Sequence, residues 1–219
     1  MNSVGDQNRL QAPASGLHNT NTFARVTLQS IEEIAGKRGV NTVLTFTGLT
    51  HLIDNYPPHD REKAFDFCHY SALMRGLEEI YGPRGGRVMA LRAGRATFAS
   101  LLKTYGAMVG VGDLAFRLVP LRVKMNIGLN AMAKVFNMVS DQKTNVYDHK
   151  EWFWYAVEQC PACWGREHVT VPICYTQVGL LQEGLRWLSN GREFKVEEVQ
   201  CLAMGHDRCL FRVNKEPVR

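Results

Sequence analysis

The sequence lacks the features of a membrane-spanning or exported protein. The 219-residue sequence contains no run that approaches the roughly 20 consecutive apolar residues needed to span a bilayer. Residues 1–21 are rich in Asn, Gln, Ser and Gly, without the basic and apolar segments of a secretory signal. We therefore expect a cytoplasmic protein, in whose reducing surroundings the six cysteines do not form structural disulfides.

The sequence also has only a small excess of one sign of charge. The 26 Lys and Arg residues against 21 Asp and Glu give a net charge of only +5. The densest basic cluster lies between Arg84 and Arg95, and it is interleaved with glycines and small apolar residues rather than aromatics. Nucleic-acid binding requires basic residues gathered on one face, so we expect no nucleic-acid partner.

Familiar catalytic motifs are missing. The segment Gly82-Pro83-Arg84-Gly85-Gly86 is not followed by Lys and Ser or Thr, which a phosphate-binding P-loop requires. There is no Gly-x-Ser-x-Gly elbow, no His-Glu-x-x-His helix and no nicotinamide or flavin fingerprint. The sequence thus gives no support to a hydrolase or to a reductase with its own hydride source.

What is present indicates helices followed by strands. The polar residues 1–22 predict a disordered arm, and residues 23–219 predict a single domain. Apolar spacing predicts helices over 28–37, 60–81, 86–105, 114–139 and 171–188, with breaks at Gly82-Pro83 and at Pro120. Aromatic and β-branched residues predict strand at 145–158, and a hairpin at 193–202 and 209–213. This order is typical of an α+β domain with an antiparallel sheet.

The cysteines are the most informative residues. Cys160 and Cys163 form a Cys-x2-Cys pair, and Glu198, Cys201 and Cys209 follow on the predicted hairpin. Thiolate and carboxylate ligands suit tetrahedral zinc. Because Glu198 and Cys201 are three residues apart, a β-bulge is needed to direct both side chains to one point.

Other interpretations of these cysteines stay open. In one alternative interpretation, Cys201 and Cys209 are two buried thiols that bind no metal. An all-cysteine zinc site that includes Cys160 and Cys163 is chemically equally good, and that pair is otherwise a redox couple. Cys68 stands alone on a predicted helix face, which indicates a buried core thiol.

The C-terminal motif resembles a known family. The segment Glu198-Val-Gln-Cys201-Leu-Ala-Met-Gly-His-Asp-Arg-Cys209-Leu-Phe is similar to the closing signature of vinyl-4-reductase-type domains, and specific motifs extend over about 160–213. Such domains bind small molecules and also occur in the sensory modules of phenol-responsive activators. The resemblance implies helices packed on one face of an antiparallel sheet, as in vesicle-tethering and haem-nitric-oxide-binding relatives, and a homodimer.

The resemblance also implies a site. Its metal ligands would be Cys174, Glu198, Cys201 and Cys209, holding one structural zinc. A sensor tryptophan that lines the ligand pocket falls near Trp152 or Trp154, and these two share one strand face. The ligand-contacting histidine of the phenol sensors has no counterpart here, since Lys124 or Asn126 occupies its neighbourhood. Phenol recognition is therefore not carried over.

Together these observations predict a non-catalytic protein that binds an apolar small molecule, such as a hydrocarbon, an aromatic or a tetrapyrrole. Met125 and Met132 belong to the predicted 114–139 helix and are candidates for an adaptable cavity wall, although ordinary core filling is the simpler interpretation of each. Four protein ligands leave zinc no open position for an activated water, so we expect no catalysis there. Alternatives are an accessory role in tetrapyrrole vinyl-group reduction and a protein-interaction scaffold.

Overall fold

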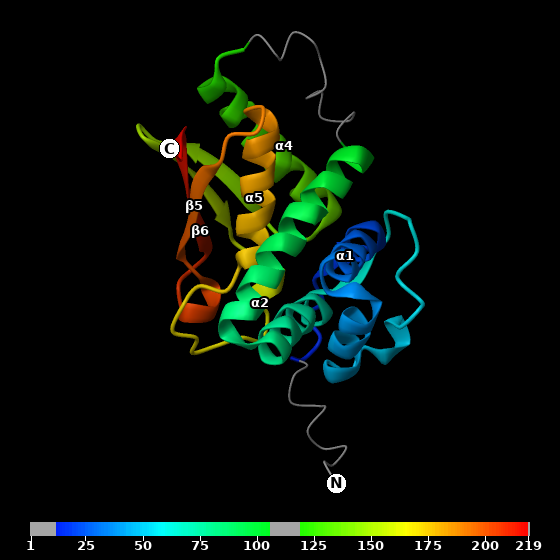
Figure 1. Cartoon of the computed structure of the whole chain (residues 1–219). Helices are drawn as coiled ribbons and strands as arrows, with labels where there is room; N and C mark the ends of the chain where they lie inside the picture. The colour runs from blue at the N-terminus through cyan, green and yellow to red at the C-terminus, as the bar shows by residue number, and fades with distance from the viewer. Residues whose placement is uncertain (1–11, 106–118, 219) are drawn as a thin grey trace.

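The computed structural model describes residues 12–105 and 119–218 (Figure 1). Two long helices and a two-stranded sheet come first, and a four-stranded sheet with two further helices follows. The helices and strands in chain order are β1 (His18–Thr20), α1 (Asn21–Phe46), β2 (Lys63–Asp66), α2 (Phe67–Tyr105), α4 (Leu121–Val139), β3 (Thr144–Asp148), β4 (Trp152–Val157), α5 (Tyr175–Leu188), β5 (Phe194–Gln200) and β6 (Cys209–Pro217). Three short 3-10 turns are η2 (Thr50–Leu52), η4 (Pro161–Cys163) and η5 (Leu202–Met204).

The larger sheet is antiparallel throughout, with strand order β3-β4-β6-β5. Along β4 the side chains alternate: Phe153 and Tyr155 are fully buried, whereas Trp152 and Trp154 are partly exposed on the other face. Figure 1 shows α4 and α5 along one side of this sheet, with α2 crossing them and α1 beyond. The predicted α+β class, with helices on one face of an antiparallel sheet, is confirmed.

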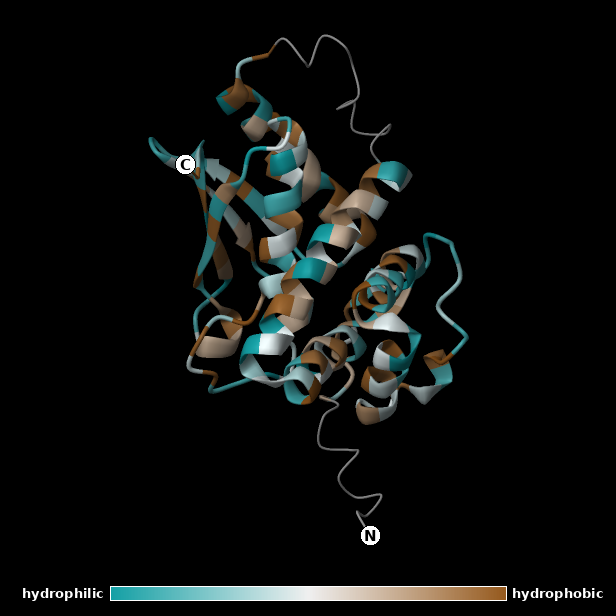
Figure 2. Ribbon diagram, viewed as in Figure 1, coloured by the Kyte–Doolittle hydropathy of each residue, from teal (hydrophilic) through white to brown (hydrophobic). Residues whose placement is uncertain are grey.

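Hydrophobic side chains fill the layers between these elements. Residues of α1, α2, α4, α5 and the inner face of the sheet form one continuous core. In Figure 2 the hydrophobic residues gather where the helices meet one another and the sheet. Among the described residues, no helix combines the length and apolar character needed to cross a membrane.

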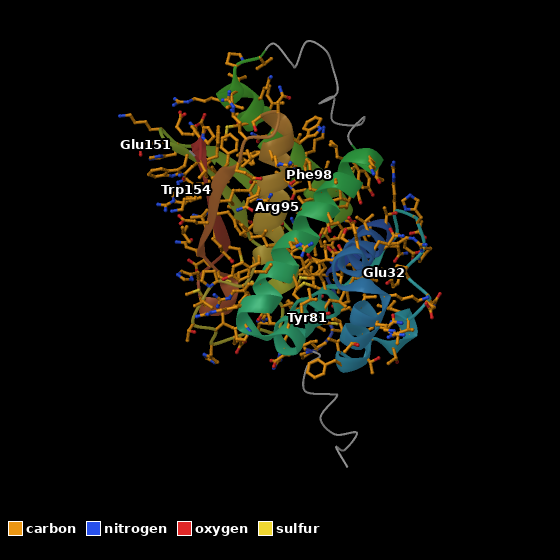
Figure 3. All side chains as sticks on the ribbon, viewed as in Figure 1. Glu32, Tyr81, Arg95, Phe98, Glu151 and Trp154 are labelled. Atoms are coloured by element: carbon orange, nitrogen blue, oxygen red, sulfur yellow. The ribbon has the colours of Figure 1, made fainter. Side chains whose placement is uncertain are left out.

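Glycines set the shape of the helical layer. Both α1 and α2 bend at a glycine in the left-handed region, Gly36 and Gly82, each with φ of 73°. Where α2 crosses α5, a Cβ on Gly94 would lie 2.0 Å from the Thr176 carbonyl oxygen, and one on Gly179 would lie 2.0 Å from that of Leu91. Only glycine permits this backbone-to-backbone approach. Nearby, Arg95 of α2 pairs with Glu193 after α5 at 2.9 Å (Figure 3).

Several element boundaries differ from the prediction. The predicted disordered arm is wrong over its last part, because residues 18–20 form β1, which pairs with β2, and Asn19 is fully buried. The predicted strand 145–158 is a hairpin of β3 and β4. The first helix spans 21–46 rather than 28–37, since Thr20 caps it and helix resumes beyond Gly36. The break at Gly82 and the helix start after Pro120 are confirmed, while residues 114–118 lie outside the described residues.

Candidate metal centre and apolar cavity

Five cysteine sulfurs converge at the end of the sheet where β6 begins. Cys163 Sγ lies 3.4, 3.6 and 3.5 Å from the sulfurs of Cys174, Cys201 and Cys209, respectively. Cys174 Sγ lies 3.5 Å from that of Cys160 and 3.7 Å from that of Cys209. All are buried except Cys160, which is partly exposed. Residues separated by up to 49 positions thus form one cluster.

Each cysteine lies at or next to the end of a helix, a strand or a short turn. Cys160 precedes η4 and Cys163 ends it, and Cys163 N–H donates to the Cys160 carbonyl. Cys174 is the N-cap residue of α5, and Cys209 is the first residue of β6. Cys201 follows the bulged strand β5, whose register shifts between Glu198 and Gln200. The bulge predicted to bring Glu198 and Cys201 together is therefore present.

The spacing of the sulfurs fits a tetrahedral thiolate site. A zinc ion with Zn–S bonds of about 2.3 Å holds its sulfur ligands about 3.8 Å from one another. The measured sulfur separations of 3.4–3.7 Å are close to this value. In addition, Leu202 N–H donates to Cys209 Sγ at 3.4 Å, as suits a sulfur that carries negative charge.

Glu198 completes the cluster. Its Oε2 accepts a hydrogen bond from Cys174 N–H at 2.8 Å, whereas its Oε1 is buried and has no hydrogen-bond partner in the described structure. Burial, together with the nearby Cys201, raises the pKa of Glu198 to about 8. An unpartnered buried carboxylate oxygen is costly, so this position favours either a proton or a cation.

The structure brings the predicted metal ligands together in two overlapping sets of residues. Candidate donor atoms of Cys174, Glu198, Cys201 and Cys209 all lie within 4.8 Å of one another. The alternative ligands Cys160 and Cys163 form a second such set with Cys174 and Cys209. Cys68 lies outside both sets, buried on α2 as predicted, where burial raises its thiol pKa to about 12. His206 contacts the backbone of Cys201 through Nδ1, at 3.1 Å from the carbonyl oxygen.

An apolar hollow lies between α2, α4 and α5. Its empty volume, open mouth included, is about 540 Å³. Phe98 of α2, labelled in Figure 3, belongs to its wall. The lining residues are Phe98, Leu101, Leu102, Tyr105, Gly128, Ala131, Met132, Val135, Phe136, Leu180, Gly184, Trp187 and Leu188.

Of the residues predicted for the cavity wall, Met132 lines the hollow, whereas Met125 is fully buried in the core and does not line it. Trp152 and Trp154 do not line it either, because their strand positions place them on the face opposite the buried Phe153. Trp154 is labelled in Figure 3. Instead the two tryptophan rings pack edge to face at 5.7 Å, and the Arg212 guanidinium lies 5.9 Å from the Trp152 ring.

Sequence reasoning missed most of the cavity. Apart from α4, which the sequence did indicate, its wall comes from the second half of α2 and from α5, not from the aromatic strand. The apolar spacing of Phe98, Leu101, Leu102 and Tyr105 was visible, but such a stripe is the same for a helix in a core and a helix beside a cavity. At Gly184 a Cβ would lie 2.8 Å from Met132 Sδ, so this glycine allows Met132 and Phe98 to pack closely against α5.

Solved structures share this fold at low identity. A point variant of "Tt H-NOX" aligns with a TM-score of 0.60 and 14% identity, covering 91% of this chain and 97% of that one. The Fe(II) unliganded H-NOX protein from K. algicida gives 0.58 and 10%, covering 91% and 97%. An H-NOX protein from S. oneidensis in the Fe(II)NO ligation state gives 0.54 and 13%, covering 89% and 99%. At these identities the likeness shows the fold alone.

The sequence itself matches a family model over the region of the cysteines. No curated protein has a significant match to the chain. Residues 153–215, from β4 to β6, match the model of the V4R domain. This region contains Cys160, Cys163, Cys174, Cys201 and Cys209, together with Glu198. Residues 153–215 of the chain therefore match the V4R domain, as the closing motif predicted.

Proposed function

We propose that this protein binds an apolar small molecule in the hollow between α2, α4 and α5, without chemical turnover. The observation that carries the proposal is the lining, which is almost entirely aliphatic and aromatic. Binding there is driven by removal of apolar surface from water, and the ring edges favour a hydrocarbon or an aromatic compound. The V4R match and the shared fold support ligand binding as the general role.

Zinc is the second part of the proposed function. The donor chemistry fits, because closely spaced thiols and a buried carboxylate are typical ligands of structural zinc. Cys174, Cys201 and Cys209 would hold the ion, with Glu198 or a further thiol as the fourth ligand. Bound there, zinc supplies a cross-link between the start of α5 and the β5–β6 hairpin.

Haem fits this chain less well. A haem iron needs an axial ligand, most often histidine or cysteine and in some proteins tyrosine or methionine. Among the described residues that line the hollow there is no histidine or cysteine, and Tyr105 and Met132 are the lining residues of the rarer ligand types. The haem of the H-NOX proteins with a similar fold is a property of those proteins. An apolar organic ligand agrees better with the lining found here.

A blocking substitution tests the site. Ala131→Phe adds a ring into the hollow, so the affinity for the apolar fluorophore N-phenyl-1-naphthylamine should fall by roughly tenfold, the equivalent of about 1.4 kcal/mol. Val123→Phe is the matched control, because Val123 lies on the exposed side of the same helix and does not line the hollow. Fluorescence titration measures both. Equal affinity for the fluorophore in the two variants and the unmodified protein contradicts the proposal.

A further inference from the structure

The two sets of candidate metal ligands are not independent. Cys160 and Cys163 belong to one set, and Glu198 and Cys201 belong to the other. Cys174 and Cys209 belong to both, and their sulfurs lie 3.7 Å apart. The two candidate sets therefore overlap at Cys174 and Cys209 and together contain six donor residues.

A single tetrahedral ion does not use all of these donors. It takes four ligands, which leaves two of the six without a metal. Glu198 Oε1 already lacks a hydrogen-bond partner in the described structure, and Cys160 Sγ lies 3.5 Å from Cys174 Sγ. If all six donors are ionised, they carry six negative charges, and one divalent ion leaves four of these uncompensated. A second ion reduces that remainder to two, which is less costly in a buried site.

We propose that the cluster binds two zinc ions that share the sulfurs of Cys174 and Cys209. Cys160 and Cys163 are terminal ligands of one ion, and Glu198 and Cys201 are terminal ligands of the other. The sharing works because a thiolate sulfur has lone pairs for two metals. This inference rests on the zinc site in the proposed function and extends it, since that function requires one ion only.

One distance bears directly on the arrangement. The sulfurs of Cys163 and Cys201 lie 3.6 Å apart, closer than terminal ligands of two different ions are expected to be. Loading the second ion must therefore separate them. Cys163 ends the short turn η4 and Cys201 precedes η5, so this movement involves two turns rather than the sheet.

Metal content and cobalt substitution test the inference together. The purified full chain, saturated with zinc and desalted, should contain two zinc ions per chain by mass spectrometry. In a titration of metal-free protein with Co²⁺, the high-spin cobalt signal in electron paramagnetic resonance should rise to about one equivalent. It should then fall as the second ion binds, because ions that share a thiolate couple magnetically. An unrelated surface-bound ion does not produce this fall.

Variants separate the two ions. Cys160→Ser/Cys163→Ser should lower the zinc content from two to one and abolish the fall of the cobalt signal. Cys68→Ser is the control, since Cys68 is a buried cysteine outside the cluster, and it should keep two ions. If the double variant does not fold, the zinc content and the cobalt titration of the unmodified chain still test whether two ions are bound.

The outcomes distinguish this inference from the function on which it rests. One zinc ion per chain, with a cobalt signal that never falls, overturns the shared site but keeps the structural zinc. No zinc at all overturns both. Two ions whose cobalt signals simply add also contradict the inference, because independent sites do not couple.

Discussion

At the scale of single residues, Asp66 shows how one carboxylate fixes a chain segment. It is 8% exposed and accepts hydrogen bonds from Ser15 N–H, Ser15 Oγ, Gly16 N–H and Cys68 N–H, at 2.7–3.2 Å. Burial acts to raise the pKa of Asp66, but the hydrogen bonds from Cys68 and Ser15 outweigh it and hold the pKa well below the usual range. The carboxylate thereby attaches residues 15–16 to the start of α2.

This arrangement predicts a pH-dependent loss of stability in Asp66→Asn. At pH 7 the free energy of unfolding should fall by about 1–3 kcal/mol, because the amide cannot accept all of these hydrogen bonds. A carboxyl group with a lowered folded-state pKa stabilises the fold above its unfolded pKa, near 4, and loses that contribution as the pH falls further. The difference from the unmodified protein should therefore shrink below about pH 4.

Urea unfolding at pH 7 and pH 3 measures this difference. Asp207→Asn is the control, since Asp207 is exposed in the turn before β6, and it should change stability by less than about 0.5 kcal/mol at both values. A difference between Asp66→Asn and the unmodified protein that stays constant with pH would mean that the charge of Asp66 is unimportant.

At the scale of elements, the bend in α2 depends on Gly82. Its φ of 73° and ψ of 169° belong to a region that is essentially restricted to glycine. Gly82→Ala should therefore lower the free energy of unfolding by about 1–3 kcal/mol. Gly85→Ala is the matched control three residues along: Gly85 has no positive φ, and its added Cβ would lie 3.3 Å from Tyr81 Cβ.

Thermal or urea unfolding of the two variants checks this assignment. Gly85→Ala should have an effect within about 1 kcal/mol, because alanine favours helix and the close contact with Tyr81 opposes that gain. If Gly82→Ala is as stable as Gly85→Ala, the bend does not require glycine.

The elements could be predicted from sequence where local chemistry decides them. The Gly82-Pro83 break, the helix start after Pro120 and the β5–β6 hairpin follow from residues that act locally. The β1 strand does not, because three residues near the N-terminus form a strand only when β2 and Ser140 lie beside them. The site divides in the same way: the closing motif indicated Cys201 and Cys209, but only the three-dimensional fold places Cys163 within 3.6 Å of three other sulfurs.

At the scale of the whole molecule, the cysteine cluster brings together segments that are far apart in the chain. The cluster joins the turn after β4, the start of α5 and the β5–β6 hairpin. The predicted single domain from residue 23, the homodimer and the cytoplasmic location are statements at this scale, and they stay predictions.

Removing the metal should therefore lower the melting temperature. Zinc present at 100 times its dissociation constant adds about 2.7 kcal/mol of stability when it binds only the folded state. For a chain of this size, that corresponds to roughly 5–10 °C. Differential scanning fluorimetry with and without a strong chelator measures the shift, and Cys201→Ser should show little of it. A melting temperature of the unmodified protein that does not change when the chelator is added contradicts the prediction of a structural metal.

Helix α5 begins at the metal cluster and ends at the apolar hollow. Cys174 is its N-cap residue, while Leu180, Gly184 and Leu188 line the hollow. Between them, Gly179 holds the helix against the backbone of α2. Suppose that filling the hollow changes the position of α5 and thereby strengthens zinc binding by some factor. Thermodynamic linkage then requires that zinc strengthens the binding of the ligand by the same factor. In that case α5 would couple the two sites, and the supply of zinc would change the affinity for the ligand.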